Sequence, residues 1–184
     1  MLAILYLVLA IYLGDQICRR FFRYVSVAQR CASAVLVGLL LSTWFTYIAS
    51  WCFGKTRTPL LWGDLCFFAV ALGIISLFRR RPRAGQFILP RIAGSAFWDW
   101  VTLGAFFVMA CWMMFATLNY KDGTLLIGNN EWSDFGPNTA IIQSFAVGHN
   151  FPTQYPHFSG ETIRYHFLFY FQAGNLTFLG SNIA

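Results

Sequence analysis

The chain has 184 residues, of which 58% are hydrophobic and only 11% are charged. Soluble domains carry about a quarter charged residues, so this composition excludes an ordinary water-soluble fold and indicates a protein that faces lipid. The formal net charge is +6, but most of the basic residues lie in two short segments between apolar runs, a distribution that argues against a nucleic-acid partner.

Five apolar segments predict membrane-spanning helices, at about residues 2–18, 31–53, 60–78, 96–118 and 165–179. The first of these has about the minimum length that crosses the hydrocarbon core, and the last is a minimal anchor. The sequence therefore predicts an all-α polytopic membrane protein. It divides into a four-helix transmembrane region over 1–118, a loop over 119–164 and a fifth transmembrane helix over 165–184. Because no basic segment follows the last span, we expect the chain to be a piece of a longer protein.

Two arginine clusters predict the orientation. They comprise Arg19, Arg20, Arg23 and Arg30, and then Arg79, Arg80, Arg81, Arg83 and Arg91. Basic residues in short loops mark the cytoplasmic side, so the N-terminus and the 119–164 loop are predicted to lie outside a cell (inner) membrane. We expect anionic lipids to be the partners of these arginines. The five cysteines are scattered and show no metal-binding or redox spacing.

Ionisable residues gather in and just after the long loop. This region holds Asp122, Glu131, Asp134, Glu161, His149, His157 and His166. Such groups beside a membrane are functional candidates. Gly136-Pro137 predicts the start of a helix, and apolar residues at helical spacing between Ala140 and Ala146 predict that it is amphipathic and lies on the membrane surface. Gly148 should end this helix, and a proline-broken strap should follow over residues 151–160.

Four groups of residues carry a resemblance to a known family. They are Trp132-Ser133-Asp134-Phe135, Ile141 to Gly148, Asn150-Phe151-Pro152, and Tyr155 to Glu161. This order resembles the first external loop of the GT-C glycosyltransferase superfamily and covers about a quarter of the chain. The resemblance implies a donor sugar on a polyprenyl-phosphate carrier. It also implies that Asp134 is the catalytic or metal-binding residue, with Mg²⁺ or Mn²⁺ as the possible cation. More spans precede the loop here than in simpler members of the superfamily.

Several loop residues are candidates for this chemistry. Asp134 could act as a general base or hold a divalent cation, and Arg164 could bind the donor phosphate. The further candidate substrate contacts are His157, Glu161, Tyr165 and His166.

Simpler roles compete with these. Asp134 could instead cap the loop helix, and Arg164 could be an interfacial anchor. His157 and Glu161 have a metal-compatible spacing only on a helix, which Pro156 and Gly160 disfavour.

Polar residues in or near the spans have structural interpretations. Asp64 and Asp99 are predicted to be interfacial caps. Gln172 and Asn175 are predicted to make hydrogen bonds between helices.

The leading functional hypothesis is a membrane glycosyltransferase whose active face is extracytoplasmic. One alternative is a transporter or flippase in which the loop is a gate. Another is a non-catalytic membrane subunit whose loop binds a membrane-protein partner.

Overall fold

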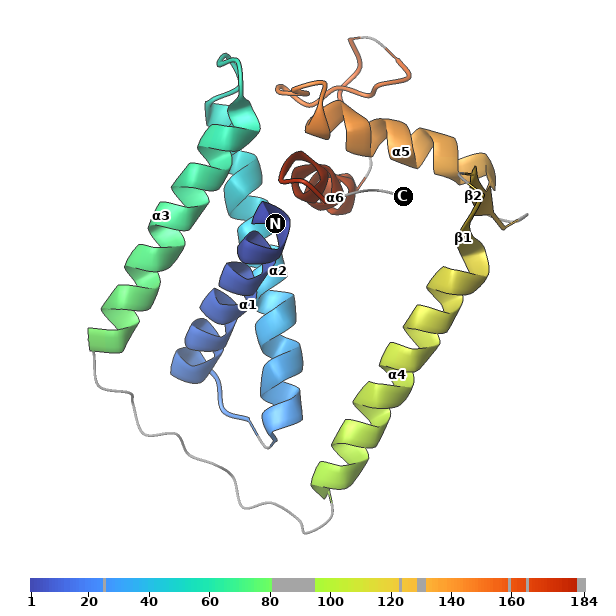
Figure 1. Cartoon of the computed structure of the whole chain (residues 1–184). Coiled ribbons are helices and arrows are strands. Elements are labelled where there is room, and N and C mark those ends of the chain that lie inside the picture. The colour runs from blue at the N-terminus through green and yellow to red at the C-terminus, as the bar shows by residue number, and fades with distance from the viewer. Residues whose placement is uncertain are drawn as a thin grey trace.

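The computed structural model describes residues 1–24, 26–80, 95–122, 124–128, 132–158, 160–164 and 166–181. The described part is mostly helical, as predicted. Its elements are α1 (Leu2–Phe21), α2 (Val27–Cys52), α3 (Pro59–Arg80), α4 (Ser95–Thr117), β1 (Leu118–Lys121), β2 (Thr124–Ile127), α5 (Trp132–Ala146) and α6 (Leu168–Phe178). Figure 1 shows α1, α2 and α3 side by side, whereas α4 contacts α2 over a short stretch and otherwise diverges from the three.

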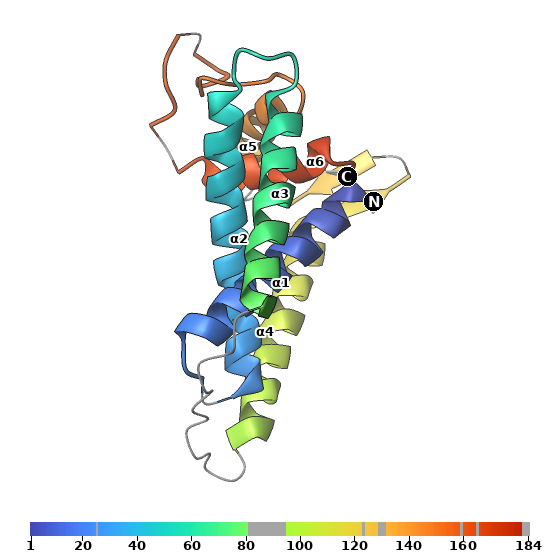
Figure 2. The same ribbon diagram turned by 90° about the vertical axis from the view of Figure 1, so that its left-hand side faces the viewer.

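Four helices in the described residues, α1 to α4, are long and apolar enough to cross a membrane. At the fifth predicted span, over 165–179, the structure has a helix that is shorter than predicted. This helix, α6, contains 11 residues and is therefore only about 16 Å long, against about 30 Å of hydrocarbon. Figures 1 and 2 show that α6 runs across the long axes of α2 and α3 instead of alongside them. The described residues thus hold four candidate spans.

Small residues bring α1 and α2 into close contact. A Cβ added to Gly14 would clash with the backbone oxygen of Ala34, and one added to Gly38 would clash with that of Ala10. Each helix therefore presents a pair of small residues four positions apart, Ala10 with Gly14 and Ala34 with Gly38. This spacing lets two helix backbones approach each other in a membrane.

A buried polar cluster joins the spans to α6. Asn175 Nδ2 donates to Asp64 Oδ1 over 2.9 Å, and Thr43 Oγ1 donates to Gln172 Oε1 over 2.7 Å. The prediction that Gln172 and Asn175 bond to other helices is confirmed. The prediction that Asp64 is an interfacial cap is wrong, because this side chain is only 2% exposed and lies inside α3 against α6.

Helix α4 is far more exposed than the other candidate spans. None of the residues in its most apolar stretch is buried, whereas α1, α2 and α3 are each partly buried inside the molecule. Large apolar side chains such as Phe107 and Phe115 are 70% and 79% exposed. An apolar face of this kind is compatible with lipid, which is as apolar as the side chains themselves.

A two-stranded hairpin follows α4, which the all-α prediction did not include. Strands β1 and β2 are antiparallel, with Lys121 paired to Thr124 and Leu118 paired to Ile127. The two residues between the strands are Asp122 and Gly123 in the sequence, and Asp122 has a φ of +52°. An Asp-Gly pair at this position is a strong hairpin signal, because both residues tolerate positive φ.

Helices α5 and α6 form a layer at the end of the bundle where α3 begins (Figure 1). The predicted apolar face of the loop helix supplies part of this layer, since Ile141, Phe145 and Ala146 are buried. A Cβ on Gly174 of α6 would come within 2.7 Å of the Ile142 backbone oxygen. The two helices therefore pack closely, and both contribute residues to the lining of one pocket.

Candidate functional site

The strap after α5 folds into a closed loop that α2 and its own hydrogen bonds hold in place. Gln154 forms an antiparallel bridge with Thr162, and Tyr155 N donates to the Glu161 backbone oxygen over 2.7 Å. Gly160, with a φ of +88°, allows the chain to turn back between these residues. The loop is tied to the bundle by a 2.9 Å hydrogen bond between the Tyr47 hydroxyl and Thr153 Oγ1.

Asn150 fixes the entry into this strap. Its side-chain oxygen accepts from Gln154 N over 2.7 Å, while its Nδ2 donates to Gln154 O over 2.7 Å and to Ser144 Oγ over 3.0 Å. One amide thus joins the end of α5 to the start of the strap. The asparagine in the Asn150-Phe151-Pro152 pattern has a structural role that the sequence did not indicate.

A pocket of about 650 Å³ lies between α5, the strap and α6. Its lining comprises Asp134, Pro137, Asn138 and Ile141 of α5, Tyr155, Phe158, Glu161, Thr162 and Arg164 of the strap and the segment after it, and Tyr170 of α6. The elements that line it, α5, the strap and α6, lie at one end of the bundle (Figure 2). The pocket therefore belongs to the region that the sequence singled out for its ionisable residues.

Three predicted site residues line this pocket together. They are Asp134, Glu161 and Arg164, which come from two segments separated by more than twenty residues. All three are exposed to solvent, so the pocket presents two carboxylates and one guanidinium to a ligand. Such a set can accept hydrogen bonds from hydroxyl groups and donate a bidentate pair to a phosphate.

The position of Asp134 on its helix differs from the prediction. Helix α5 begins at Trp132, four residues before the predicted start at Gly136, and so includes Pro137 in its interior. Asp134 lies in the first turn, where the exposed N–H groups and the helix dipole favour a negative charge. The carboxylate is thus stabilised by the helix end while it also faces the pocket.

The other predicted contacts lie elsewhere. His157 is exposed, and its ring centroid lies 5.4 Å from that of Tyr155, but His157 is not part of the pocket lining. His166 is likewise exposed and outside the lining. Tyr165 lies outside the described residues. The strap is not helical at His157 and Glu161, as the neighbouring proline and glycine predicted.

Sequence reasoning missed the aromatic walls of the pocket. Tyr155, Phe158 and Tyr170 line it, and the Phe158 side chain is 66% exposed. In the sequence, Phe158 is one of three aromatic residues of the strap, with Phe151 and Tyr155, and no pattern marked it as part of a pocket. Tyr170 had no signal either, since it lies in an apolar segment that the hydropathy assigned to a span.

The donor set limits which metal could bind. Among the described residues, no group of three or more His, Cys, Asp or Glu side chains is close enough to hold a metal ion. Asp134 and Glu161 are the two acidic residues of the pocket lining. Two carboxylates suit Mg²⁺ or Mn²⁺ when water and a substrate phosphate supply the remaining oxygens.

Comparisons with protein-family models, with curated proteins and with solved structures give no match to this chain. The resemblance of the loop to the GT-C superfamily therefore stays a prediction that rests on the sequence pattern.

Proposed function

We propose that the pocket is the active site of a membrane glycosyltransferase that takes a sugar from a polyprenyl-phosphate carrier. The observation that supports this proposal is the joint lining of one pocket by Asp134, Glu161, Arg164 and three aromatic rings. A sugar ring is rich in hydroxyl groups at its edge, which need hydrogen-bond acceptors. Its faces pack on flat apolar surfaces. A pocket with carboxylates and aromatic rings offers both.

The carrier fits the location of the pocket. A polyprenyl chain lies in the bilayer, so its phosphate and sugar lie at the membrane surface. Arg164 offers a planar fork of N–H donors that matches two phosphate oxygens. In this proposal Arg164 binds the donor phosphate, while Tyr155, Phe158 and Tyr170 enclose the sugar.

Asp134 has the central role in the proposed reaction. An acceptor hydroxyl oxygen attacks the anomeric carbon of the sugar, and the bond between that carbon and the phosphate oxygen breaks. The Asp134 carboxylate takes the proton of the hydroxyl as the new bond forms, and the polyprenyl phosphate leaves with the bonding electrons on its oxygen. The configuration at the anomeric carbon inverts, because attack and departure occur on opposite faces.

A divalent cation is compatible with the pocket. As the alternative to the base role, Asp134 together with Glu161 would hold Mg²⁺ or Mn²⁺, with oxygens of water and substrate as the other ligands. When bound, the ion would neutralise negative charge on the phosphate.

The proposed orientation follows the arginines. The arginines gather around the end of α1 and the start of α2 and at the end of α3, which favours a cytoplasmic location for that end of the bundle. The opposite end with the pocket is then extracytoplasmic. A cell membrane is the proposed location.

Replacing Asp134 by Asn tests the function directly. The purified, reconstituted protein is incubated with a panel of polyprenyl-phosphate hexoses and pentoses, and transfer to acceptor or water is measured. We expect Asp134→Asn to lower the rate by about 100-fold or more, because it removes the base without changing the shape of the side chain. Asp122→Asn is the matched control, since Asp122 is an exposed acid in the hairpin. Equal rates in the wild type and Asp134→Asn would refute the assignment.

The buried Asp64 favours a second candidate function. An ionisable side chain buried inside a candidate span is a default functional candidate, and Asp64 is such a residue, five positions after the start of α3. If the protein is a transporter, Asp64→Asn should abolish uptake of its solute into liposomes. If it is the proposed transferase, Asp64→Asn should keep the sugar-transfer activity. The two hypotheses are thus separated by a variant outside the pocket.

A further inference from the structure

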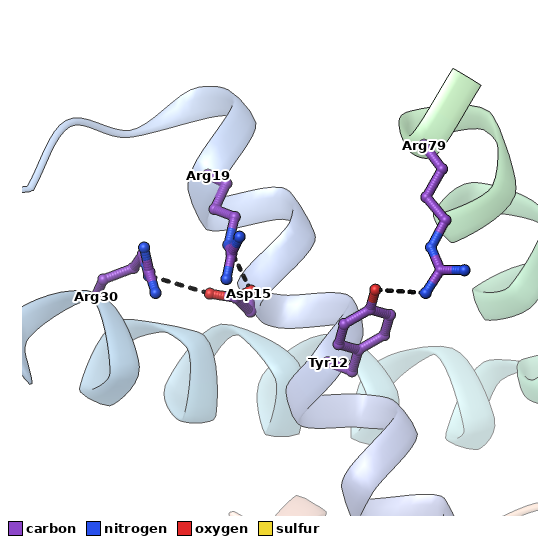
Figure 3. A network of polar contacts seen from close by, with 5 residues as sticks. All are labelled: Tyr12, Asp15, Arg19, Arg30 and Arg79. Carbon is purple, nitrogen blue, oxygen red and sulfur yellow. Dashed lines mark hydrogen bonds and ion pairs between the residues drawn. The ribbon is translucent and has the colours of Figure 1, made fainter. Parts of the chain in front are cut away.

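The end of the bundle opposite the pocket contains a preorganised group of arginines. Asp15 of α1 lies between two of them, with its Oδ2 2.6 Å from Arg19 Nε and its Oδ1 3.2 Å from Arg30 Nε (Figure 3). The first pair is a single-helix contact between residues four apart, and the second joins α1 to α2. One carboxylate therefore fixes two guanidinium groups that belong to different helices.

A third arginine is held on the other side of α1. Arg79 Nη2 donates to the Tyr12 hydroxyl over 2.8 Å, and the Arg79 guanidinium carbon lies 5.7 Å from the centre of the Tyr12 ring. Figure 3 shows Arg79 reaching Tyr12 from α3, while Arg19 and Arg30 reach Asp15. At this end of the bundle, each of α1, α2 and α3 thus has an arginine with a defined partner.

The Asp15 group keeps a positive charge that an anion can use. One carboxylate faces two guanidinium groups, so the group of Asp15, Arg19 and Arg30 carries one positive charge in excess. Both ion pairs use the Nε atom, and a guanidinium bound in this way still has an edge of two Nη groups for a second anion. The Arg19 and Arg30 side chains are 27% and 25% exposed, so such an anion can approach them.

The surroundings of this group are those of a membrane surface. The exposed apolar side chains Phe21, Phe22 and Val27, which are 68%, 57% and 52% exposed, lie between the two arginines along the chain. A soluble phosphate would gain nothing from these side chains, whereas a phospholipid would place its acyl chains against them and its phosphate beside the arginines.

We propose that Arg19 and Arg30, oriented by Asp15, bind the phosphate of an anionic phospholipid at the end of the bundle opposite the pocket. The proposal does not depend on the glycosyltransferase function, because it rests on other residues at the other end of the molecule. In this proposal, the arginine end of the bundle retains an anionic phospholipid.

Native mass spectrometry of the protein with phosphatidylglycerol and phosphatidylcholine tests the proposal. We expect the wild type to retain phosphatidylglycerol preferentially. Arg19→Gln/Arg30→Gln should weaken that retention by about 25-fold, or about fivefold for each arginine. Lys55→Gln/Arg57→Gln is the matched control, since it removes two positive charges between α2 and α3 at the pocket end. An equal loss in both double variants would overturn the proposal.

A charge-preserving variant separates a built site from general attraction. Arg19→Lys/Arg30→Lys keeps both charges but removes the planar forks, so we expect a severalfold loss of phosphatidylglycerol. Unchanged retention would show that only net charge matters and would contradict the site. Displacement of the lipid by millimolar glycerol phosphate would also contradict it, because the site would then take soluble phosphates. Size-exclusion chromatography establishes that each variant is folded before lipid is measured.

Discussion

The two ends of the helical bundle are built in different ways. At the arginine end, Asp15 forms ion pairs with Arg19 one turn away and with Arg30 in the next helix, so one short segment of sequence supplies the whole Asp15 group. At the pocket end, α5, the strap and α6 must come together before any site exists. Charged side chains at a membrane surface can thus be positioned by residues that are close together in the sequence. A ligand pocket requires packing between residues that are far apart in the sequence.

The largest effect is expected from Gly174→Leu, which should disrupt the packing of α5 on α6 at the pocket end and leave the arginine end intact. The added side chain would meet the α5 backbone at Ile142, which cannot move aside like a flexible side chain. We expect a loss of about 1–3 kcal/mol in the free energy of unfolding and loss of the pocket. Thermal unfolding in detergent measures the first, and donor binding measures the second.

Gly73→Leu is the control for this variant, because a Cβ at Gly73 has no neighbour within 4 Å. Phosphatidylglycerol retention should persist in both variants. If Gly174→Leu abolished lipid retention as well, the two ends would not be independent.

Arg164→Gln should weaken binding of a polyprenyl-phosphate sugar. A hydrogen bond to a charged group contributes about 1.5–3 kcal/mol, so the affinity should fall by about 10- to 150-fold. Isothermal titration with a short-chain donor analogue measures this change. Arg57→Gln removes the same charge from the loop between α2 and α3, outside the pocket lining, and should change the affinity little. Equal losses in the two variants would reduce Arg164 to a general electrostatic role.

The Asp64–Asn175 hydrogen bond should contribute a smaller amount to stability. Asp64→Leu leaves the buried Asn175 amide without its acceptor, and we expect it to lower the free energy of unfolding by about 1 kcal/mol. A double-mutant cycle with Asn175→Leu measures the coupling. If the effects of the two substitutions were simply additive, the bond would not fasten α6 to α3.

The smallest expected effect is that of Asp15→Asn on stability. Its two ion pairs are partly exposed to solvent, and pairs of this kind contribute less than about 1 kcal/mol. We therefore expect little change in thermal unfolding but a measurable loss of phosphatidylglycerol, because the two arginines are no longer oriented. A large loss of stability would show that Asp15 holds the bundle together instead.

The four long helices were predictable because hydropathy is a local property. Each of α1 to α4 corresponds to one predicted span, with bounds that differ by a few residues. The fifth predicted span corresponds to α6, an 11-residue helix that is shorter than the hydrocarbon core is thick. Residues of α6 such as Phe171 and Asn175 are buried inside the protein, and hydropathy does not tell whether protein or lipid surrounds an apolar segment.

The candidate site was predictable in its charges but not in its shape. Asp134, Glu161 and Arg164 were visible as ionisable residues in an unusual loop, and the structure brings them to one pocket. Tyr170 and Asn138 could not be found in this way. Their place in the pocket depends on how α5 crosses α6, which no local pattern specifies. His157 was selected for its chemistry, and its exposed position beside Tyr155 follows from a turn that the sequence indicated only in part.

Photo-crosslinking with a polyprenyl-phosphate sugar that carries a photoreactive group on the sugar tests the central claim most directly. The account predicts that labelled peptides come from α5 and from the strap around Tyr155 and Glu161. It also predicts that excess unmodified donor abolishes the labelling. Labelling confined to α4 or to the arginine end, or labelling that excess donor does not reduce, would contradict the assignment of the pocket as the sugar-binding site.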